Sequence, residues 1–168
     1  GHYNMQLVKA IPMCTDDDPE LLGVLLRQVD AFSKVWVKSM TWQEYLNAIE
    51  HRCQIRKVMA WLRNVEVPSH QFCHGDLTLE NVIVNRSGIY LLDPNTRLNF
   101  NSSHLDRGKI LFSRAYHDIF ESYWLTDVMQ QAIERVEWSK ADYACLLTHI
   151  IRLSGYCLLY TSDAADEG

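Results

Sequence analysis

The chain has 168 residues, 48% of them apolar and 22% charged, which is the composition of one ordinary globular domain able to bury a core. Its 21 acidic residues outnumber its 16 basic ones and no long basic run occurs, which argues against nucleic acid or an anionic membrane surface as the main partner. No stretch approaches the roughly 18 consecutive apolar residues of a membrane span, and the start has no signal-peptide pattern, so we expect a cytoplasmic protein.

The first predicted elements are a short strand and a helix. Residues 3–8 look like the end of a strand already under way, which predicts a start in mid-domain. Asp18 is placed as the N-cap of a helix with Pro19 at its first position, and apolar residues then recur at helical spacing over residues 21–36. We therefore expect an amphipathic helix that begins at Pro19.

A second helix is predicted directly afterwards. Thr41 and Glu44 have the spacing of a capping box, in which each side chain bonds the backbone of the other residue. The apolar face that follows continues to about Asn64, and Pro68 forbids further continuation. We therefore expect one helix from the capping box to about Asn64.

The character of the sequence then changes to that of a β-hairpin. Residues 81–84 and 89–92 are two short runs rich in β-branched or aromatic side chains, and the turn sequence Asn-Arg-Ser-Gly lies between them. A lone two-stranded hairpin is only marginally stable in water. We therefore expect helices to support it.

Three more helices are predicted after the hairpin. Apolar positions at helical spacing over residues 105–123 predict the first of them. Thr126 or Asp127 is placed to cap the second, and Ser139 with Asp142 to cap the third. The expected order is two helices, a hairpin and three helices, so the predicted fold class is α+β and mainly α-helical.

The last segment does not have the composition of the rest. Residues 157–168 resemble the translation of a widely used transposase sequencing adapter, and a natural acidic tail is the alternative. No internal repeat or low-complexity linker divides the remainder. We therefore expect one domain over residues 1–156 and a non-native tail over residues 157–168.

The loop that precedes the hairpin carries the candidate chemistry. It begins at His74, and its residues Asp76 and Asn81 stand five positions apart, while Asp93 follows the second predicted strand. Phosphoryl transfer from ATP needs a carboxylate that accepts the proton of the attacking hydroxyl, and oxygen ligands that hold Mg²⁺ against the phosphates. Asp76, Asn81 and Asp93 supply oxygen atoms of these kinds from nearby points of the chain.

This pattern resembles the catalytic loop of protein kinases, H-x-D-L-x-x-x-N followed by a metal-binding Asp. With glycine in its second place, it is more similar to the H-G-D-x-x-x-x-N loop of the aminoglycoside phosphotransferase and choline kinase superfamily. The resemblance extends over about residues 5–156, and residues 74–95 are its specific part. It implies the C-terminal lobe of a protein-kinase-like fold, with a small β-hairpin at the catalytic loop.

The resemblance also assigns roles to individual residues. It makes Asp76 the catalytic base and Asn81 and Asp93 the ligands of Mg²⁺, with ATP as the phosphate donor. It gives His74 a structural role in the loop and makes Asp106 the helix-borne acid that supports it. An acid in the first turn of a helix, favoured by the helix dipole, is the equally weighted alternative for Asp106. The implied acceptor is a hydroxyl of a small molecule such as a sugar, an amino sugar or choline.

Two parts of such a kinase are missing from the sequence. The seven glycines never form a glycine-rich loop, and no lysine lies in a Val-Ala-Ile-Lys-like strand. In the family both belong to the N-terminal lobe, so the residues that bind ATP from that side stay unknown. We expect the full-length parent to be the enzyme and the chain alone to have little activity. Alternatives are a non-catalytic kinase-like scaffold, or Asp76 and Asn81 as ordinary loop caps.

Overall fold

The computed structural model describes residues 11–32, 38–69, 71–95, 100–120 and 125–163, with the backbone alone for 118–120 and 155–163. The strand expected over residues 3–8 and the continuation of the first helix to residue 36 lie outside these ranges. Within them the helices and strands are, in chain order, β1 (Ile11–Pro12), α1 (Glu20–Phe32), α2 (Trp42–Ile49), α3 (Arg56–Arg63), β2 (Val82–Asn85), β3 (Gly88–Leu91), α4 (Ser103–Phe120), α5 (Asp127–Arg135) and α6 (Lys140–Asp163). The protein is thus α+β and mostly helical, as predicted.

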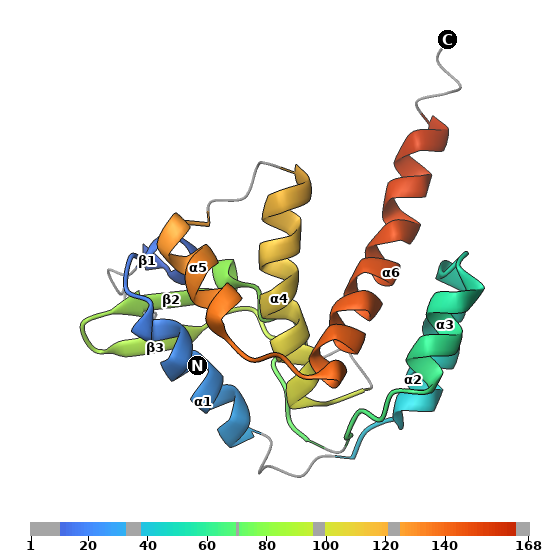
Figure 1. Cartoon of the computed structure of the whole chain (residues 1–168), viewed down its shortest axis with the longest axis horizontal. Coiled ribbons are helices and arrows are strands. Elements are labelled where there is room, and N and C mark those ends of the chain that lie inside the picture. The colour runs from blue at the N-terminus through green and yellow to red at the C-terminus, as the bar shows by residue number, and fades with distance from the viewer. Residues whose placement is uncertain (1–10, 33–37, 70, 96–99, 121–124, 164–168) are drawn as a thin grey trace, which may run out of the picture.

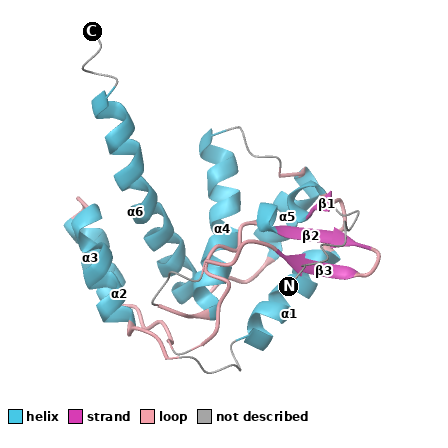
Figure 2. Ribbon diagram, turned by 180° about the vertical axis from the view of Figure 1, so that it is seen from behind, coloured by secondary structure: helices cyan, strands magenta, loops and turns pink. Residues whose placement is uncertain are grey.

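The elements form two packed groups with α4 between them. Figure 1 shows the sheet with α1 and α5 at one side, α4 in the middle, α6 beside α4, and the α2–α3 pair beyond α6; the view from behind gives the same order (Figure 2). One apolar cluster packs the sheet and α1 against α4 and α5, and a second packs α2 and α3 against α6 and the start of α4. Across the described residues, no helix is both long and apolar enough to cross a membrane.

The helix caps predicted from the sequence are confirmed, although α1 begins at Glu20, one residue after the predicted start at Pro19. The Asp18 carboxylate accepts a hydrogen bond from the Glu20 N–H at the start of α1, at 3.0 Å. Both halves of the Thr41–Glu44 capping box are present at the start of α2. Such a cap stabilises a helix by about 1 kcal/mol because it satisfies backbone N–H groups that have no partner within the helix. The remaining predicted caps are also present, at Thr126 for α5 and at Ser139 with Asp142 for α6.

The single helix predicted after the capping box is wrong. The chain forms α2 and α3 instead, because Cys53 and Ile55 have extended backbone conformations, with ψ of 112° and 94°. This break turns α3 back along α2, so that the Trp42 Nε1–H donates to the Leu62 carbonyl at 3.0 Å. A straight helix would carry Leu62 about 30 Å from Trp42, at 1.5 Å per residue. Packing of the two apolar faces against each other therefore overrides the continuous helical pattern.

The hairpin is confirmed, and it has a partner strand that the sequence did not predict. Asn85 pairs with Gly88 across a two-residue turn, and the Asn85 Oδ1 accepts from the Ser87 N–H at 2.7 Å. Strand β1 adds to β2 in antiparallel register, with Ile11 opposite Val84, which gives the order β1-β2-β3. A two-residue strand is too short to show an alternating pattern, so β1 left no signal in the sequence.

Helices α4 and α6 approach closely at Gly108. A Cβ atom there would lie 2.7 Å from both the Cys145 Cβ and the Leu146 backbone N. Because one of these neighbours is backbone, a Gly108→Ala change must push the two helices apart. We expect it to lower the free energy of unfolding by about 2 kcal/mol, despite the roughly 1 kcal/mol that alanine gains in helix propensity. Urea denaturation measures this change.

Gly23→Ala in α1 is the matched control for this prediction. A Cβ at Gly23 would meet only the Arg27 Nη1, at 3.4 Å, which is the flexible end of a side chain. The control should therefore be neutral or should stabilise by up to about 1 kcal/mol. Equal effects of the two substitutions would show that the contact at Gly108 does not limit the approach of α4 and α6.

A buried histidine in α6 makes the fold sensitive to acid. The His149 Nε2–H donates to the Leu105 carbonyl of α4 at 3.0 Å. Burial, and then the positive charge of Lys109, lower the pKa of His149 from 6.5 to about 3. Below pH 6.5 the unfolded chain therefore takes up a proton that the folded chain does not, and stability falls as the pH falls towards 3.

A His149→Gln variant isolates this effect, since its amide can still donate to the Leu105 carbonyl. As the pH falls from 6.5 to 5, the free energy of unfolding of the variant should rise by about 2 kcal/mol relative to that of the wild type. One proton contributes about 1.4 kcal/mol per pH unit. Asp106, whose pKa is raised, has the opposite pH dependence but is present in both proteins and cancels. Urea titrations of both proteins at pH 7.5, 6.5 and 5 measure the difference. A difference that does not change with pH would rule out His149 as the acid-sensitive group.

Candidate functional site

The first turn of α4 holds the start of the loop that was predicted to be catalytic. The Asp106 Oδ2 accepts a hydrogen bond from the His74 N–H at 2.7 Å, and its Oδ1 accepts from the Gly75 N–H at 2.8 Å. Gly75 has a φ of 80°, which allows two successive N–H groups to point at one carboxylate. Asp106 is fully buried. Burial raises its pKa to about 7, and the two N–H donors act in the opposite direction.

Two further residues of α4 contact the same loop. The Lys109 Nζ lies 2.9 Å from the Asp76 Oδ1, and the Ser113 Oγ accepts from the Leu79 N–H at 3.2 Å. Lys109 and Ser113 follow Asp106 by three and seven residues, so all three lie on one face of the helix. Neither Lys109 nor Ser113 was predicted from the sequence to belong to the site. Their spacing from Asp106 was the available signal, but it had no meaning until the loop was known to run along α4.

His74 links the loop to the end of β3. Its Nε2 lies 2.8 Å from the Leu92 carbonyl and its Nδ1 lies 3.3 Å from the Asp76 backbone N. A carbonyl only accepts and an N–H only donates, so the imidazole is neutral with its proton on Nε2. Burial lowers the pKa of His74, which agrees with a neutral ring. The His74 carbonyl also accepts from the Asn95 N–H at 2.8 Å. The described contacts of His74 are thus those of a residue that holds the loop in place.

Asn81 bridges the loop and the strand end. Its side-chain Nδ2 donates to the backbone carbonyl of Asp76 at 2.8 Å. Its backbone carbonyl accepts from the Leu92 N–H, also at 2.8 Å. The first bond orients the side-chain amide so that its Oδ1 is the atom outside that bond. Oxygen is the atom that a hard cation such as Mg²⁺ takes from an amide side chain. Asn81 is therefore oriented as an oxygen donor beside Asp76 and Leu92.

Asp93 leaves the end of β3 in an unusual conformation. Its φ is 53°, in the left-handed region, and no other residue apart from glycine has a positive φ in the described part of the chain. Such a conformation costs about 1–2 kcal/mol for a residue with a side chain, and it occurs preferentially at functional sites. The Asp93 side chain is exposed. Burial has the largest effect on the pKa of His74 and lowers it, while the negative charges of Asp76 and Asp93 both raise it. Both carboxylates therefore lie near that imidazole.

The three residues predicted for catalysis and metal binding thus lie around one loop and one strand end. Asp76 presents a half-exposed carboxylate, while Asn81 and Asp93 present an amide oxygen and a second carboxylate. No group of three or more His, Cys, Asp or Glu side chains is placed to hold a metal among the residues that the structure describes. Two oxygen donors do fit Mg²⁺, since it keeps several waters and commonly binds through one or two protein oxygens plus substrate phosphates.

Comparisons of the chain with protein-family models, with curated proteins and with solved structures found no match. The resemblance to the aminoglycoside phosphotransferase and choline kinase superfamily therefore stays a prediction made from residues 74–95.

Proposed function

We propose that this chain is the C-terminal, catalytic half of an ATP-dependent phosphotransferase that acts on a hydroxyl of a small molecule such as a sugar, an amino sugar or choline. One observation carries the proposal: hydrogen bonds join the loop from His74 to Asn81 both to α4 and to the chain that leaves β3, so Asp76, Asn81 and Asp93 lie on neighbouring, supported stretches of backbone. A protein-kinase-like fold of the C-terminal lobe is part of the same proposal.

The chemistry assigned to Asp76 is that of a general base. Its carboxylate accepts the proton of the acceptor hydroxyl while the hydroxyl oxygen bonds to the terminal phosphorus of ATP. The bond between that phosphorus and the bridging oxygen breaks, and ADP leaves with the electron pair. The loop contacts of His74 and Asn81 support this role, because they hold the backbone N–H and the backbone carbonyl of Asp76 without using its carboxylate. A base held in this way needs little reorganisation when an acceptor arrives.

Asn81 and Asp93 are the residues that would hold Mg²⁺. The cation would neutralise the phosphate oxygens of ATP, as it does in phosphotransferases of this type. In this proposal the contribution of the chain is to hold the two oxygen donors beside the base. The hydrogen bond from the Asn81 Nδ2 to the Asp76 carbonyl supports this, since it couples the orientation of a metal ligand to the position of the base.

The elements that cover ATP in this family would have to come from a segment outside these 168 residues, because the sequence has no glycine-rich loop. The test is therefore made on an extended protein, which is this chain together with the segment encoded directly upstream of it. ATP consumption would be measured over a panel of sugars, aminoglycosides and choline, with and without Mg²⁺. Turnover that needs both an acceptor and Mg²⁺ is the expected result, and it would also identify the acceptor.

A non-catalytic kinase-like scaffold is the second candidate, and it is favoured because no three His, Cys, Asp or Glu side chains are placed to hold a metal among the described residues. This function predicts that the extended protein consumes no ATP with any acceptor. Binding of MgATP or MnATP, measured by calorimetry, separates the candidates further. Absence of both turnover and nucleotide binding would overturn the phosphotransferase proposal in favour of the scaffold.

A further inference from the structure

We propose that Lys109 is a positioning residue that sets the orientation of the Asp76 carboxylate for phosphoryl transfer. This inference rests on the proposed function, and it adds a residue to the site that the loop motif does not contain. It is carried by the contact between the Lys109 Nζ and the Asp76 Oδ1, at 2.9 Å.

The surroundings of Lys109 hold its ammonium group in place. The side chain is 14% exposed, although lysine side chains usually extend into water. Its Nζ also lies 4.8 Å from the centre of the Phe112 ring, a distance at which the face of an aromatic ring attracts a cation. The ammonium therefore lies between a ring and a carboxylate, where it has few alternative positions.

A fixed ammonium gives the carboxylate of Asp76 a defined orientation. The backbone of Asp76 is held by His74 and Asn81, but neither residue contacts the carboxylate itself in the hydrogen bonds described above. With Oδ1 bound to Lys109, Oδ2 is the oxygen left for an acceptor hydroxyl. The positive charge also reduces the repulsion between the carboxylates of Asp76 and Asp93 and an incoming, negatively charged phosphate chain.

The stability of the fold does not explain this ion pair. The Asp76 side chain is 38% exposed, and ion pairs of this exposure contribute about 0–1 kcal/mol. A structural role therefore predicts a small loss of stability and no specific effect on catalysis. A positioning role predicts a large effect on kcat with little effect on the binding of nucleotide.

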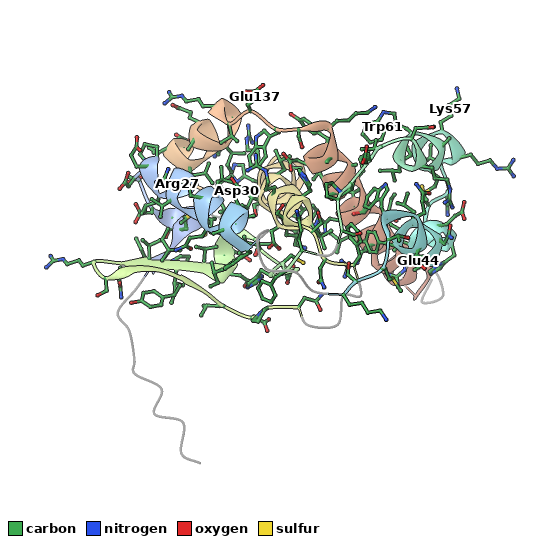
Figure 3. The ribbon with its side chains drawn as sticks, turned by 90° about the horizontal axis from the view of Figure 1, so that it is seen from below. Arg27, Asp30, Glu44, Lys57, Trp61 and Glu137 are labelled. Atoms are coloured by element: carbon green, nitrogen blue, oxygen red, sulfur yellow. The ribbon has the colours of Figure 1, made fainter. Side chains whose placement is uncertain are left out.

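The first experiment compares Lys109→Met, Lys109→Arg and Lys140→Met in the extended, ATP-consuming protein. We expect Lys109→Met to lower kcat roughly 10- to 100-fold while KM for MgATP changes less than about threefold, because a misplaced base slows the chemical step alone. Lys109→Arg should recover part of the rate, since it keeps a cation near Oδ1. Lys140→Met is the control: Lys140 is exposed at the start of α6, and its Nζ lies 5.7 Å from the ring centre of Trp61, which is labelled in Figure 3, so its loss should leave kcat unchanged.

The second experiment tests the contact without relying on activity. The lysines of the 168-residue chain are acylated, and the rate at each site is followed by mass spectrometry. We expect Lys109 to react at least tenfold more slowly than Lys140 and to react faster after Asp76→Asn, because the ion pair and burial protect its amine.

The outcomes separate this inference from the proposed function. Wild-type turnover with an equally active Lys109→Met variant would overturn the role of Lys109 and leave the phosphotransferase intact. Equal acylation of Lys109 and Lys140 would disprove the contact, whatever the activity. If the wild type transfers no phosphate, the proposed function fails and the positioning role fails with it. Protection of the Lys109 amine from acylation would then show an ion pair that is structural only.

Discussion

Asp76→Asn is expected to lower acceptor-dependent phosphoryl transfer by roughly 10²- to 10⁴-fold, the usual contribution of a general base. The amide has nearly the same shape as the carboxylate but cannot accept the proton of the acceptor hydroxyl. The backbone bonds of the loop run through His74, Asn81 and Asp106 and do not use the side chain that is changed. The free energy of unfolding should therefore fall by no more than about 1 kcal/mol, from loss of the ion pair with Lys109.

Asp30→Asn in α1 is the matched control for this substitution. The Asp30 side chain, which Figure 3 labels on α1, is 63% exposed and lies 3.8 Å from Arg107, so the same chemical change is made at an exposed carboxylate outside the loop sequence. The control should retain full activity. If Asp76→Asn keeps more than about a tenth of the wild-type kcat, Asp76 is not the base, and the reaction would have to be assigned to other groups.

Asp106→Asn is expected to have the largest effect on stability, about 2–4 kcal/mol in free energy of unfolding. The buried carboxylate accepts one N–H on each oxygen, from His74 and from Gly75. Asparagine offers one oxygen only, and its NH₂ group would face a backbone N–H, so that two donors meet at a fully buried position. A buried donor left without a partner costs about 1–3 kcal/mol, and more where the lost partner was charged.

The burial of Asp106 predicts how this loss depends on pH. Burial raises its pKa from 3.8 to about 7, so between these values the folded chain keeps a proton that the unfolded chain releases. The wild type therefore loses stability from this group as the pH rises through that window, while the asparagine variant does not. The difference between the two proteins should be larger at pH 5 than at pH 8. Urea denaturation at both values tests the sign.

Amide hydrogen exchange tests the local effect of the same variant. The N–H groups of His74 and Gly75 should exchange slowly in the wild type and faster after Asp106→Asn, with no such change after Asp30→Asn. Unchanged exchange at both amides, together with a stability loss under about 0.5 kcal/mol, would mean that Asp106 is only a first-turn acid of α4. The same result would mean that Asp106 does not hold the loop that carries Asp76.

Local sequence patterns were sufficient for the elements whose boundaries depend on neighbouring residues. The side chains of Asp18, Thr41 and Thr126 cap helices within two or three residues of themselves, and the turn after Asn85 closes on its own side chain. These interactions form within a few residues of the chain, so residue type and spacing predict them. The loop residues around Asp76 were recognisable for the same reason, because the motif is continuous in sequence.

Long-range packing decided the rest. The break at Cys53 follows from the packing of α3 on α2, which a helical pattern cannot distinguish from one long helix. Strand β1 forms because β2 offers it an edge: Ile11 pairs with Val84, 73 residues later in the chain. Lys109 meets Asp76 only because α4 lies along the loop. In each case the partner is distant in sequence, and the free energy of the contact exists only once the tertiary fold has brought the two segments together.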